Sequence, residues 1–402
     1  MTPDTSLTAL PRGWAQHDGT LGLYLHIPFC VQKCRYCDFY SATADDAARA
    51  AYVAALAAHL RAAAPAARDR VIDTVYFGGG TPTLLTGAQF ATVMDTVRAH
   101  YDLAPDAEIT AECNPVTNAE HPAEGLLAAG INRLSIGLQS ANENELRLLG
   151  RLHDYRAFAR TFAAARRAGF SNISVDLMLG IPDQTRESLS HTLDAVLALA
   201  PEHISAYGLR IEEHTPFFAM RDRLVLPDED TEELLFDDLV QRLGGAGYAH
   251  YEISNFARAG YASRHNLRYW QGREYLGFGP GAHSYFHGTR FETPKSTADY
   301  ISAANGGDFP ATVADPHPIT GREAAAEYVM LRMRLFEGLD SADFAHRFGT
   351  SFESTYGPLD RLLAGGFLTK HGTRFAFTER GMRVSNAILS DWLDFGTDEE
   401  EL

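Results

Sequence analysis

Short runs rich in β-branched and aromatic residues alternate with longer, Ala-rich amphipathic runs through the first half of the chain. This alternation is typical of βαβ units, in which crossover helices join parallel strands. Strands are expected at residues 21–27, 71–77, 108–112, 133–139, 172–177 and 203–207, and helices at 45–63, 86–101, 123–129, 143–149, 155–168 and 185–200. Six such units predict an α/β fold built on a partial (β/α)6 barrel.

Polar residues in four of these strands share one face. Successive side chains point to opposite sides of a strand, so residues two apart lie on the same side. In each strand, the residues on one face are apolar. The other face holds polar residues, which are, strand by strand, Tyr24 and His26, Thr110 and Glu112, Ser135 and Gln139, and Ser174 and Asp176. The polar sets predict a shared polar interior, with chemistry at the carboxyl ends of the strands. Cys113 shares the apolar parity and should be buried.

The regular alternation stops after about residue 215. Residues 227–247 are typical of an acidic amphipathic helix, and the Gly- and aromatic-rich segment 253–285 is expected to be a functional loop region. From residue 318 the pattern predicts helices at 322–335, 341–348 and 356–365, a hairpin at 367–378 and a last helix at 379–393, which together resemble a winged-helix module. The expected division is an N-terminal extension (1–20), the barrel (21–215), a further region (216–317), a mainly helical, winged-helix-like C-terminal domain (318–395) and an acidic tail (396–402).

The charge balance narrows the range of partners. The 402 residues include 35 Lys and Arg against 52 Asp and Glu, a formal net charge of -17 at pH 7. Nucleic-acid binding needs a basic footprint, so the acidity disfavours it, and the C-terminal module is expected to serve packing or partner docking. The N-terminus lacks a signal pattern, and no window approaches the roughly 18 apolar residues of a membrane span. We therefore expect a cytoplasmic protein, in which clustered cysteines bind metal or act in catalysis.

The segment HIPFCVQKCRYCDFYS (26–41) holds three of the four cysteines, Cys30, Cys34 and Cys37. Thiolates are the usual ligands of iron-sulfur clusters, and three of them can hold three irons of a cubane and leave the fourth iron open. A structural zinc ion takes four protein ligands, and His26 or Asp38 would have to supply the fourth. Zinc and unrelated free thiols remain the alternatives. The single triplet favours the cluster, because zinc knuckles usually pair C-x2-C units.

The triplet CVQKCRYC, preceded by YLHIPF, resembles the radical S-adenosylmethionine (SAM) superfamily, and it is similar to the oxygen-independent coproporphyrinogen oxidase branch. The resemblance covers roughly residues 20–390. It implies a 4Fe-4S cluster whose open iron is chelated by SAM, and cleavage of SAM to a 5'-deoxyadenosyl radical by one electron.

The resemblance also implies which residues contact SAM. Backbone groups of the FGGGTPT stretch approach the methionine moiety, Glu112 accepts from the ammonium, Arg151 suits the carboxylate, and Gln139 and Asp176 suit the ribose hydroxyls. The remaining implied contacts are Tyr24 near the sulfonium and Gly79, Gly80 and Thr81 within FGGGTPT.

One position separates two functions within this branch. The coproporphyrinogen oxidases carry an extra cysteine two positions after the last cluster ligand, where this chain has Phe39. The variant CDFYS therefore resembles the HemW family of heme chaperones, and HNLRYW (265–270) is similar to a motif associated with heme binding in that family. The resemblance implies His265 as heme ligand, since imidazole is a common axial ligand of heme iron. His283 in GPGAHSY is a competing ligand, although a turn-stabilising hydrogen bond is its simpler interpretation.

The leading hypothesis is a heme chaperone that binds heme, a 4Fe-4S cluster and SAM, and passes heme to acceptor hemoproteins, respiratory ones among them. The implied partners include an electron donor such as flavodoxin or ferredoxin, a second copy in a cluster-dependent homodimer, and a membrane reached only through the acceptors. The alternative is an enzyme of porphyrin biosynthesis, an oxygen-independent coproporphyrinogen III dehydrogenase, so enzymatic activity stays open. A heme-degrading or methylating radical SAM enzyme and a scaffold stabilised by its cluster are further alternatives.

Overall fold

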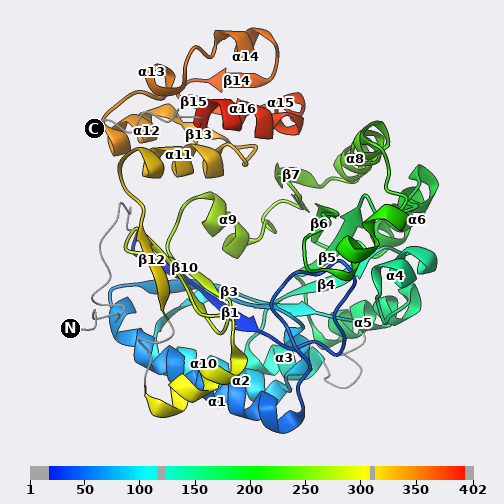
Figure 1. Cartoon of the computed structure of the whole chain (residues 1–402), viewed down its shortest axis with the longest axis vertical. Coiled ribbons are helices and arrows are strands. Elements are labelled where there is room, and N and C mark those ends of the chain that lie inside the picture. Colours follow the sequence, from blue (N-terminus) through cyan, green and yellow to red (C-terminus); the bar gives the residue numbers. More distant parts are fainter. Residues whose placement is uncertain (1–17, 116–122, 308–312, 394–402) are drawn as a thin grey trace.

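A computed structural model describes residues 18–115, 123–307 and 313–393 of the chain. Its centre is a curved twelve-stranded sheet in the order β12-β11-β10-β9-β1-β2-β3-β4-β5-β6-β8-β7 (Figure 1). Strands β1 to β6 pair in parallel and in chain order. The strands of this sheet are β1 (Thr20–Ile27), β2 (Val71–Gly79), β3 (Asp102–Cys113), β4 (Arg133–Gln139), β5 (Ile173–Leu179), β6 (His203–Gly208), β7 (Ala249–Glu252), β8 (Asn255–Ala257), β9 (Tyr275–Phe278), β10 (His283–Phe286), β11 (Thr289–Glu292) and β12 (Ala314–Pro318).

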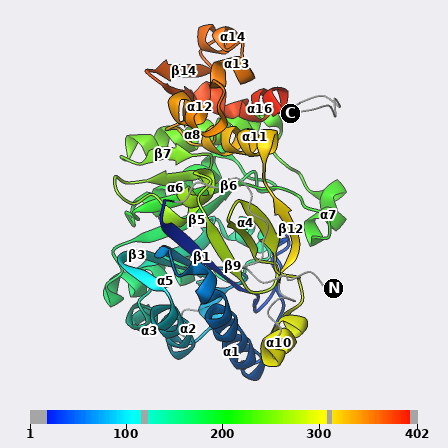
Figure 2. The same cartoon turned by 90° about the vertical axis from the view of Figure 1, so that its left-hand side faces the viewer.

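Helices cover the outer side of this sheet, as Figures 1 and 2 show. The helices outside the C-terminal region are α1 (Asp46–Ala63), α2 (Gly87–His100), α3 (Ala123–Ala129), α4 (Glu143–Leu149), α5 (Tyr155–Ala168), α6 (Arg186–Leu197), α7 (Pro216–Met220), α8 (Glu229–Gly245), α9 (Arg264–Trp270) and α10 (Thr297–Gly306). Side chains fix where they begin: Asp45 accepts from the backbone of Ala48 at α1, and Thr86 with Gln89 forms a capping box at α2. Such caps satisfy first-turn N–H groups that have no partner within the helix.

The apolar faces of the strands form the main hydrophobic core together with the outer helices. Leu23, Leu25 and Ile27 of β1 and Ile136 of β4 have no exposed surface and belong to one hydrophobic cluster with the outer helices. The polar residues on the opposite face of each strand therefore point into the barrel. All six predicted strands are present and parallel, which confirms the α/β fold with a partial (β/α)6 barrel. Strand β3 begins at Asp102, earlier than the expected 108, because its first residues pair with the start of β2.

The prediction of a loop region over 253–285 was wrong. This segment contains β8, α9, β9 and the start of β10. Strand β9 adds to β1 in parallel, and β8 adds to β6 in antiparallel, so the segment extends the six-stranded sheet at both edges. These strands are three or four residues long and exist through pairing with a preformed edge, which leaves too little periodicity to detect in the sequence.

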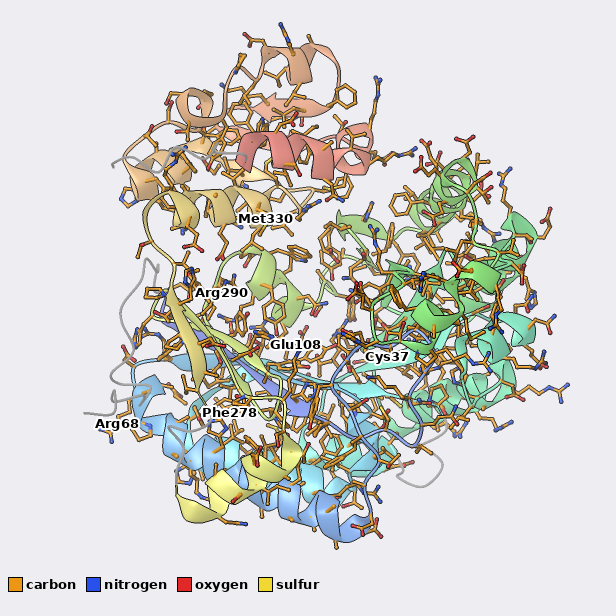
Figure 3. All side chains as sticks on the ribbon, in the orientation of Figure 1. Cys37, Arg68, Glu108, Phe278, Arg290 and Met330 are labelled. Carbon is orange, nitrogen blue, oxygen red and sulfur yellow. The ribbon has the colours of Figure 1, made fainter. Side chains whose placement is uncertain are left out.

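Helix α9 lies on the inner side of the sheet and fills the amino-terminal end of the barrel. Its first backbone N–H groups, on Arg264 and His265, donate to the Glu108 carboxylate of β3, both at 3.1 Å. Figure 3 shows Glu108 between α9 and the sheet. A carboxylate at a helix N-terminus satisfies free donors and complements the helix dipole. The plug leaves the carboxyl ends of the strands as the open end of the barrel.

The C-terminal region has its own aromatic core and a small sheet in the order β13-β15-β14. Its elements are α11 (Gly321–Arg332), β13 (Leu339–Asp340), α12 (Ser341–Phe348), α13 (Phe352–Tyr356), α14 (Asp360–Ala364), β14 (Leu368–His371), β15 (Arg374–Phe377), α15 (Glu379–Arg383) and α16 (Ser385–Leu393). This agrees with a mainly helical, winged-helix-like module, although the helix expected at 356–365 is limited to Asp360–Ala364, because Pro358 cannot continue a helix hydrogen-bond ladder. The helix expected at 379–393 is divided at Val384.

The C-terminal region touches the barrel through charge pairs. Arg383 pairs with Glu233 and Asp237 of α8. The N-terminal residues 1–17 of the expected extension and the expected acidic tail (396–402) lie outside the described residues. Within the described ranges, no helix is both long and apolar enough to cross a membrane.

Candidate functional site

A cavity of about 910 Å³ opens at the carboxyl ends of the barrel strands. This volume is within the usual range for ligand sites, roughly 300–1,000 Å³. Eleven residues predicted to bind the cluster or SAM line it: Tyr24, Cys30, Cys34, Cys37, Gly79, Gly80, Thr81, Glu112, Gln139, Arg151 and Asp176. They come from β1 to β5, from the loops that follow β1 and β2, and, for Arg151, from the connection between α4 and α5. The fold thus brings together residues that are far apart in the sequence.

The cysteine loop is tied at its base and along its length. Backbone hydrogen bonds join Cys30 to Ala42 at 3.0 Å and Ala42 to Pro28 at 2.8 Å, which closes the loop onto the end of β1. Halfway along, the Arg35 N–H donates to the Leu149 carbonyl at 3.0 Å, which anchors the loop to α4. Cys37 lies on the inner side, above the sheet, in Figure 3. These hydrogen bonds fix the loop at the cavity, which its three cysteines line.

The chemistry of the thiols suits a metal cluster. Burial, and to a smaller extent the neighbouring Cys34 and Cys30, raises the pKa of the Cys37 thiol to about 11. A thiol must lose its proton to bind iron, so cluster binding would release that proton and replace the desolvation penalty with a metal-sulfur bond. Arg151 Nη1 donates to Cys34 Sγ at 3.6 Å, and Thr81 Oγ1 lies 3.6 Å from Cys30 Sγ.

A single-ion site is a different arrangement. Across residues 18–115, 123–307 and 313–393, no three His, Cys, Asp or Glu side chains are gathered closely enough to hold one metal ion. In a cubane cluster each thiolate binds a different iron, so its ligands need to face one cavity and not one point. The three thiols meet that condition.

Glu112 lies at the end of β3 with its carboxylate toward the cavity. It accepts from the Tyr76 hydroxyl at 3.0 Å and from the Gly79 N–H at 3.1 Å. Burial, reinforced by the nearby charge of Asp176, raises the pKa of Glu112 to about 7, and the two hydrogen bonds only partly offset this. A buried carboxylate of this kind gains from a cationic partner.

Asp176 lies in the middle of β5, and Gln139 lies at the end of the neighbouring strand β4. The Ser135 hydroxyl donates to Asp176 at 2.8 Å, and burial raises the pKa of Asp176. Gln139 follows an irregularity in the β4–β5 pairing and has a φ of 70°, a left-handed conformation that non-glycine residues seldom adopt. The Gln139 side chain lines the cavity wall, on the face that strand alternation predicts.

One N–H group of the Arg151 guanidinium has no hydrogen-bond partner among the described residues. Its Nη2 donates to the Gly137 carbonyl at 3.0 Å, whereas its buried Nε has no hydrogen-bond partner among the described residues. Buried donors in native proteins are rarely left without a partner. A ligand carboxylate in the cavity would satisfy this N–H, so the site fits the acidic end of an amino-acid moiety.

The glycines of FGGGTPT have a packing role that the sequence did not reveal. A Cβ on Gly79 would lie 2.5 Å from the His26 ring, and one on Gly80 would lie 2.6 Å from the Phe29 carbonyl oxygen. Gly79 also has a φ of 110°, which strongly favours glycine. The end of β2 therefore packs against β1 and the cysteine loop, while both glycines still line the cavity.

His26 connects the end of the cysteine loop to strand β1 through hydrogen bonds. Its Nε2 lies 2.9 Å from the Tyr40 carbonyl oxygen, and its Nδ1 lies 3.2 Å from the Tyr24 hydroxyl. His26 thus joins the end of the loop to β1, a supporting hydrogen-bond role and not that of a metal ligand.

His265 lies outside the cavity wall. Its side chain is fully buried in the barrel, with Nδ1 at 2.8 Å from the Thr74 hydroxyl and Nε2 at 2.8 Å from the Tyr269 hydroxyl. The ring stacks on Tyr76 at 5.2 Å between centroids, and burial lowers its pKa to about 3. Ligation of heme iron by His265 stays a prediction, and in this arrangement it requires a hydrogen bond of the imidazole to break and the ring to leave the core.

Several tyrosines that the sequence did not single out complete the site. Tyr36, Tyr207 and Tyr275 line the cavity together with Tyr76, which bonds Glu112. Tyr269, within the HNLRYW segment, also lines the cavity and bonds His265. Tyr76 could have been found from strand parity, since it pairs with Tyr24 across β1 and β2.

Comparison with known proteins is consistent with this geometry. The Radical SAM superfamily model matches residues 24–196, and the HemN C-terminal domain model matches residues 319–384. The protein named heme chaperone HemW in Escherichia coli (strain K12) is 37% identical to this chain over 377 residues, which cover 93% of this chain and 98% of that protein. The protein of the same name in Mycobacterium tuberculosis (strain ATCC 25618 / H37Rv) is 36% identical over 373 residues, which cover 92% of this chain and 93% of that protein. The solved structure of coproporphyrinogen III oxidase (HemN) from Escherichia coli is similar to this chain in fold, with a TM-score of 0.79 at 24% identity. The match covers 94% of this chain and 90% of that one.

Proposed function

The chain belongs to the HemW family of the radical SAM superfamily, and on that premise we propose that it is a heme chaperone that binds heme together with a SAM-ligated 4Fe-4S cluster and transfers heme to acceptor hemoproteins. The relatives carry the heme chaperone name over nearly their whole length, which supports the general role. Transfer to an acceptor, an electron donor such as flavodoxin or ferredoxin, a cluster-dependent homodimer and contact with a membrane through the acceptors are parts of this proposal.

The eleven cavity residues predicted from the sequence each have a task in the proposal. Cys30, Cys34 and Cys37 hold the cluster, which when bound supplies an open iron and one electron. Arg151 and Glu112 hold the carboxylate and ammonium of SAM, because one offers a free buried N–H and the other a desolvated carboxylate. The remaining contacts proposed for SAM are Tyr24, Gly79, Gly80, Thr81, Gln139 and Asp176.

Phe39 is the observation that most favours a chaperone over an oxidase. It lines the cavity and is 68% exposed. At this position the oxidase branch has a thiol, and a phenyl ring cannot transfer a proton or a hydrogen atom as a thiol can. An exposed aromatic ring is suited instead to contact with a flat apolar ligand.

Incubating the anaerobically reconstituted protein with coproporphyrinogen III, SAM and a reductant is expected to give no protoporphyrinogen, because the thiol is missing. The same protein should bind heme stoichiometrically and pass it to an apo-cytochrome, which difference absorption spectra will follow. Formation of protoporphyrinogen would reject the chaperone proposal and support a coproporphyrinogen III dehydrogenase.

SAM binding should weaken as the pH falls from 8 to 6. The ammonium of SAM needs an ionised Glu112, whose pKa of about 7 lets protons compete for the carboxylate in this range. Below the pKa the loss approaches about tenfold per pH unit. Titration of the SAM amino group itself acts in the opposite direction, since it is more fully charged at low pH. Calorimetry at both pH values checks this.

Glu112→Gln is the matched control for this pH dependence. It removes the titrating group and should bind SAM more weakly with no loss toward low pH. If the glutamine variant kept the wild-type pH profile, another group would be responsible and Glu112 would lose its proposed role.

A further inference from the structure

An imidazole can bind heme iron only through a ring nitrogen that is free and accessible. Two histidines line the cavity, His26 and His283. Both ring nitrogens of His26 are engaged, by Tyr40 and Tyr24, and both of His265 are engaged in the core, by Thr74 and Tyr269. Only His283 among the cavity histidines has its side chain largely in the open, 63% exposed.

The position of His283 suits a metal ligand. It is the first residue of β10 and stands opposite Glu292 in the β10–β11 hairpin. Its Nε2 lies 3.4 Å from a Glu292 carboxylate oxygen, while Nδ1 makes no hydrogen bond within the described part of the chain. Metal-binding histidines commonly donate their second N–H to a carboxylate, which fixes the ring and raises its basicity. The contact with Glu292 agrees with the turn-stabilising interpretation drawn from the sequence, and it leaves Nδ1 available to a ligand.

The loop that presents His283 is packed on the cysteine loop. Gly281 has a φ of 77°, and a Cβ there would lie 3.4 Å from both Tyr40 Cβ and Lys295 Cγ. The Tyr40 hydroxyl accepts from the Thr297 N–H at 3.0 Å. The mouth of the cavity therefore brings together an imidazole, the aromatic rings of Phe39 and Tyr40, and an exposed ammonium on Lys295.

These groups match the parts of heme. Iron takes a neutral imidazole, the macrocycle takes flat aromatic faces, and a propionate carboxylate takes a cation. We propose that His283 is the axial ligand of the transported heme, that Phe39 and Tyr40 contact the macrocycle, and that Lys295 pairs with a propionate. This inference rests on the proposed function, and it gives His265 a positioning role in the barrel core.

The test is a titration of the reconstituted full-length protein with hemin, followed by difference absorption and by electron paramagnetic resonance of the ferric iron. His283→Ala should weaken binding by at least about tenfold, since even the outer partners of metal ligands cost roughly 10–100-fold. His283→Met should bind heme with a changed spectrum, because thioether replaces imidazole. Lys295→Ala should weaken binding to a smaller degree with an unchanged spectrum.

His371→Ala is the matched control, because His371 is an exposed histidine on β14 of the C-terminal region. It should leave both affinity and spectrum unchanged. An unaltered spectrum in both His283 variants would overturn the assignment while leaving the chaperone role intact. If the wild-type protein bound no hemin at all, the proposed function would fail first, and this assignment with it.

Discussion

Replacing Cys34 by serine is expected to abolish the 4Fe-4S cluster. Each thiolate of the triplet would hold a separate iron, so no neighbouring residue can take over the lost bond. The loss should exceed the roughly 10–100-fold that outer partners of metal ligands cost in affinity. Iron and sulfide analysis of the anaerobically reconstituted variant, with its visible absorption, measures the effect. SAM affinity should fall too, since the open iron is lost.

Cys113→Ala is the control, because it removes a cysteine that is not proposed to bind the cluster. Cys113 is 4% exposed, lies in the main core, and its burial raises the pKa of its thiol to about 12. The alanine variant should assemble the cluster fully and lose only a little stability. A cluster that survived in Cys34→Ser but vanished in Cys113→Ala would contradict the proposed ligand set. Zinc in place of iron in the purified wild-type protein would do so as well.

The barrel and its polar interior could be predicted because strand parity is a local property. Thr110, Glu112, Ser135 and Asp176 were sorted inward by their spacing alone, and the structure brings Ser135 and Asp176 within 2.8 Å of each other. Side-chain alternation needs no knowledge of neighbouring strands. The curvature of the sheet then places these residues in one cavity.

The segment 253–285 shows where this reasoning ends. Strands β8 and β9 are stable only because β6 and β1 offer free edges, and those edges are far away in sequence. Helix α9 is seven residues long, below the length at which a helix is stable in isolation, so its place depends on tertiary contacts. A motif such as HNLRYW gives the residue types but not the side that each one faces. His265 is consequently found in the core and not at the cavity mouth.

Arg268 in the middle of that motif is expected to be among the most costly residues to remove. Its side chain has no exposed surface. It pairs with Asp73 of β2 and donates to the Glu274 carbonyl at 3.0 Å and the Thr20 hydroxyl at 3.1 Å. A Cβ on Gly22 would lie 2.6 Å from Arg268 Cδ, so β1 keeps a glycine where this side chain crosses it. Arg268 thus fastens the plug helix to two strands.

Arg268→Met should lower the free energy of unfolding by about 3–5 kcal/mol, because it leaves the Asp73 carboxylate largely buried without its main partner. Urea unfolding of the full chain, followed by circular dichroism, measures this. Arg264→Ala on the same helix is the control and should cost under about 1 kcal/mol, since the Arg264 side chain is 42% exposed. Combining Arg268→Met with Asp73→Asn should recover part of the loss by removing the stranded charge. Equal losses in the Arg268 and Arg264 variants would mean that α9 is held by its backbone contacts to Glu108 and not by this ion pair.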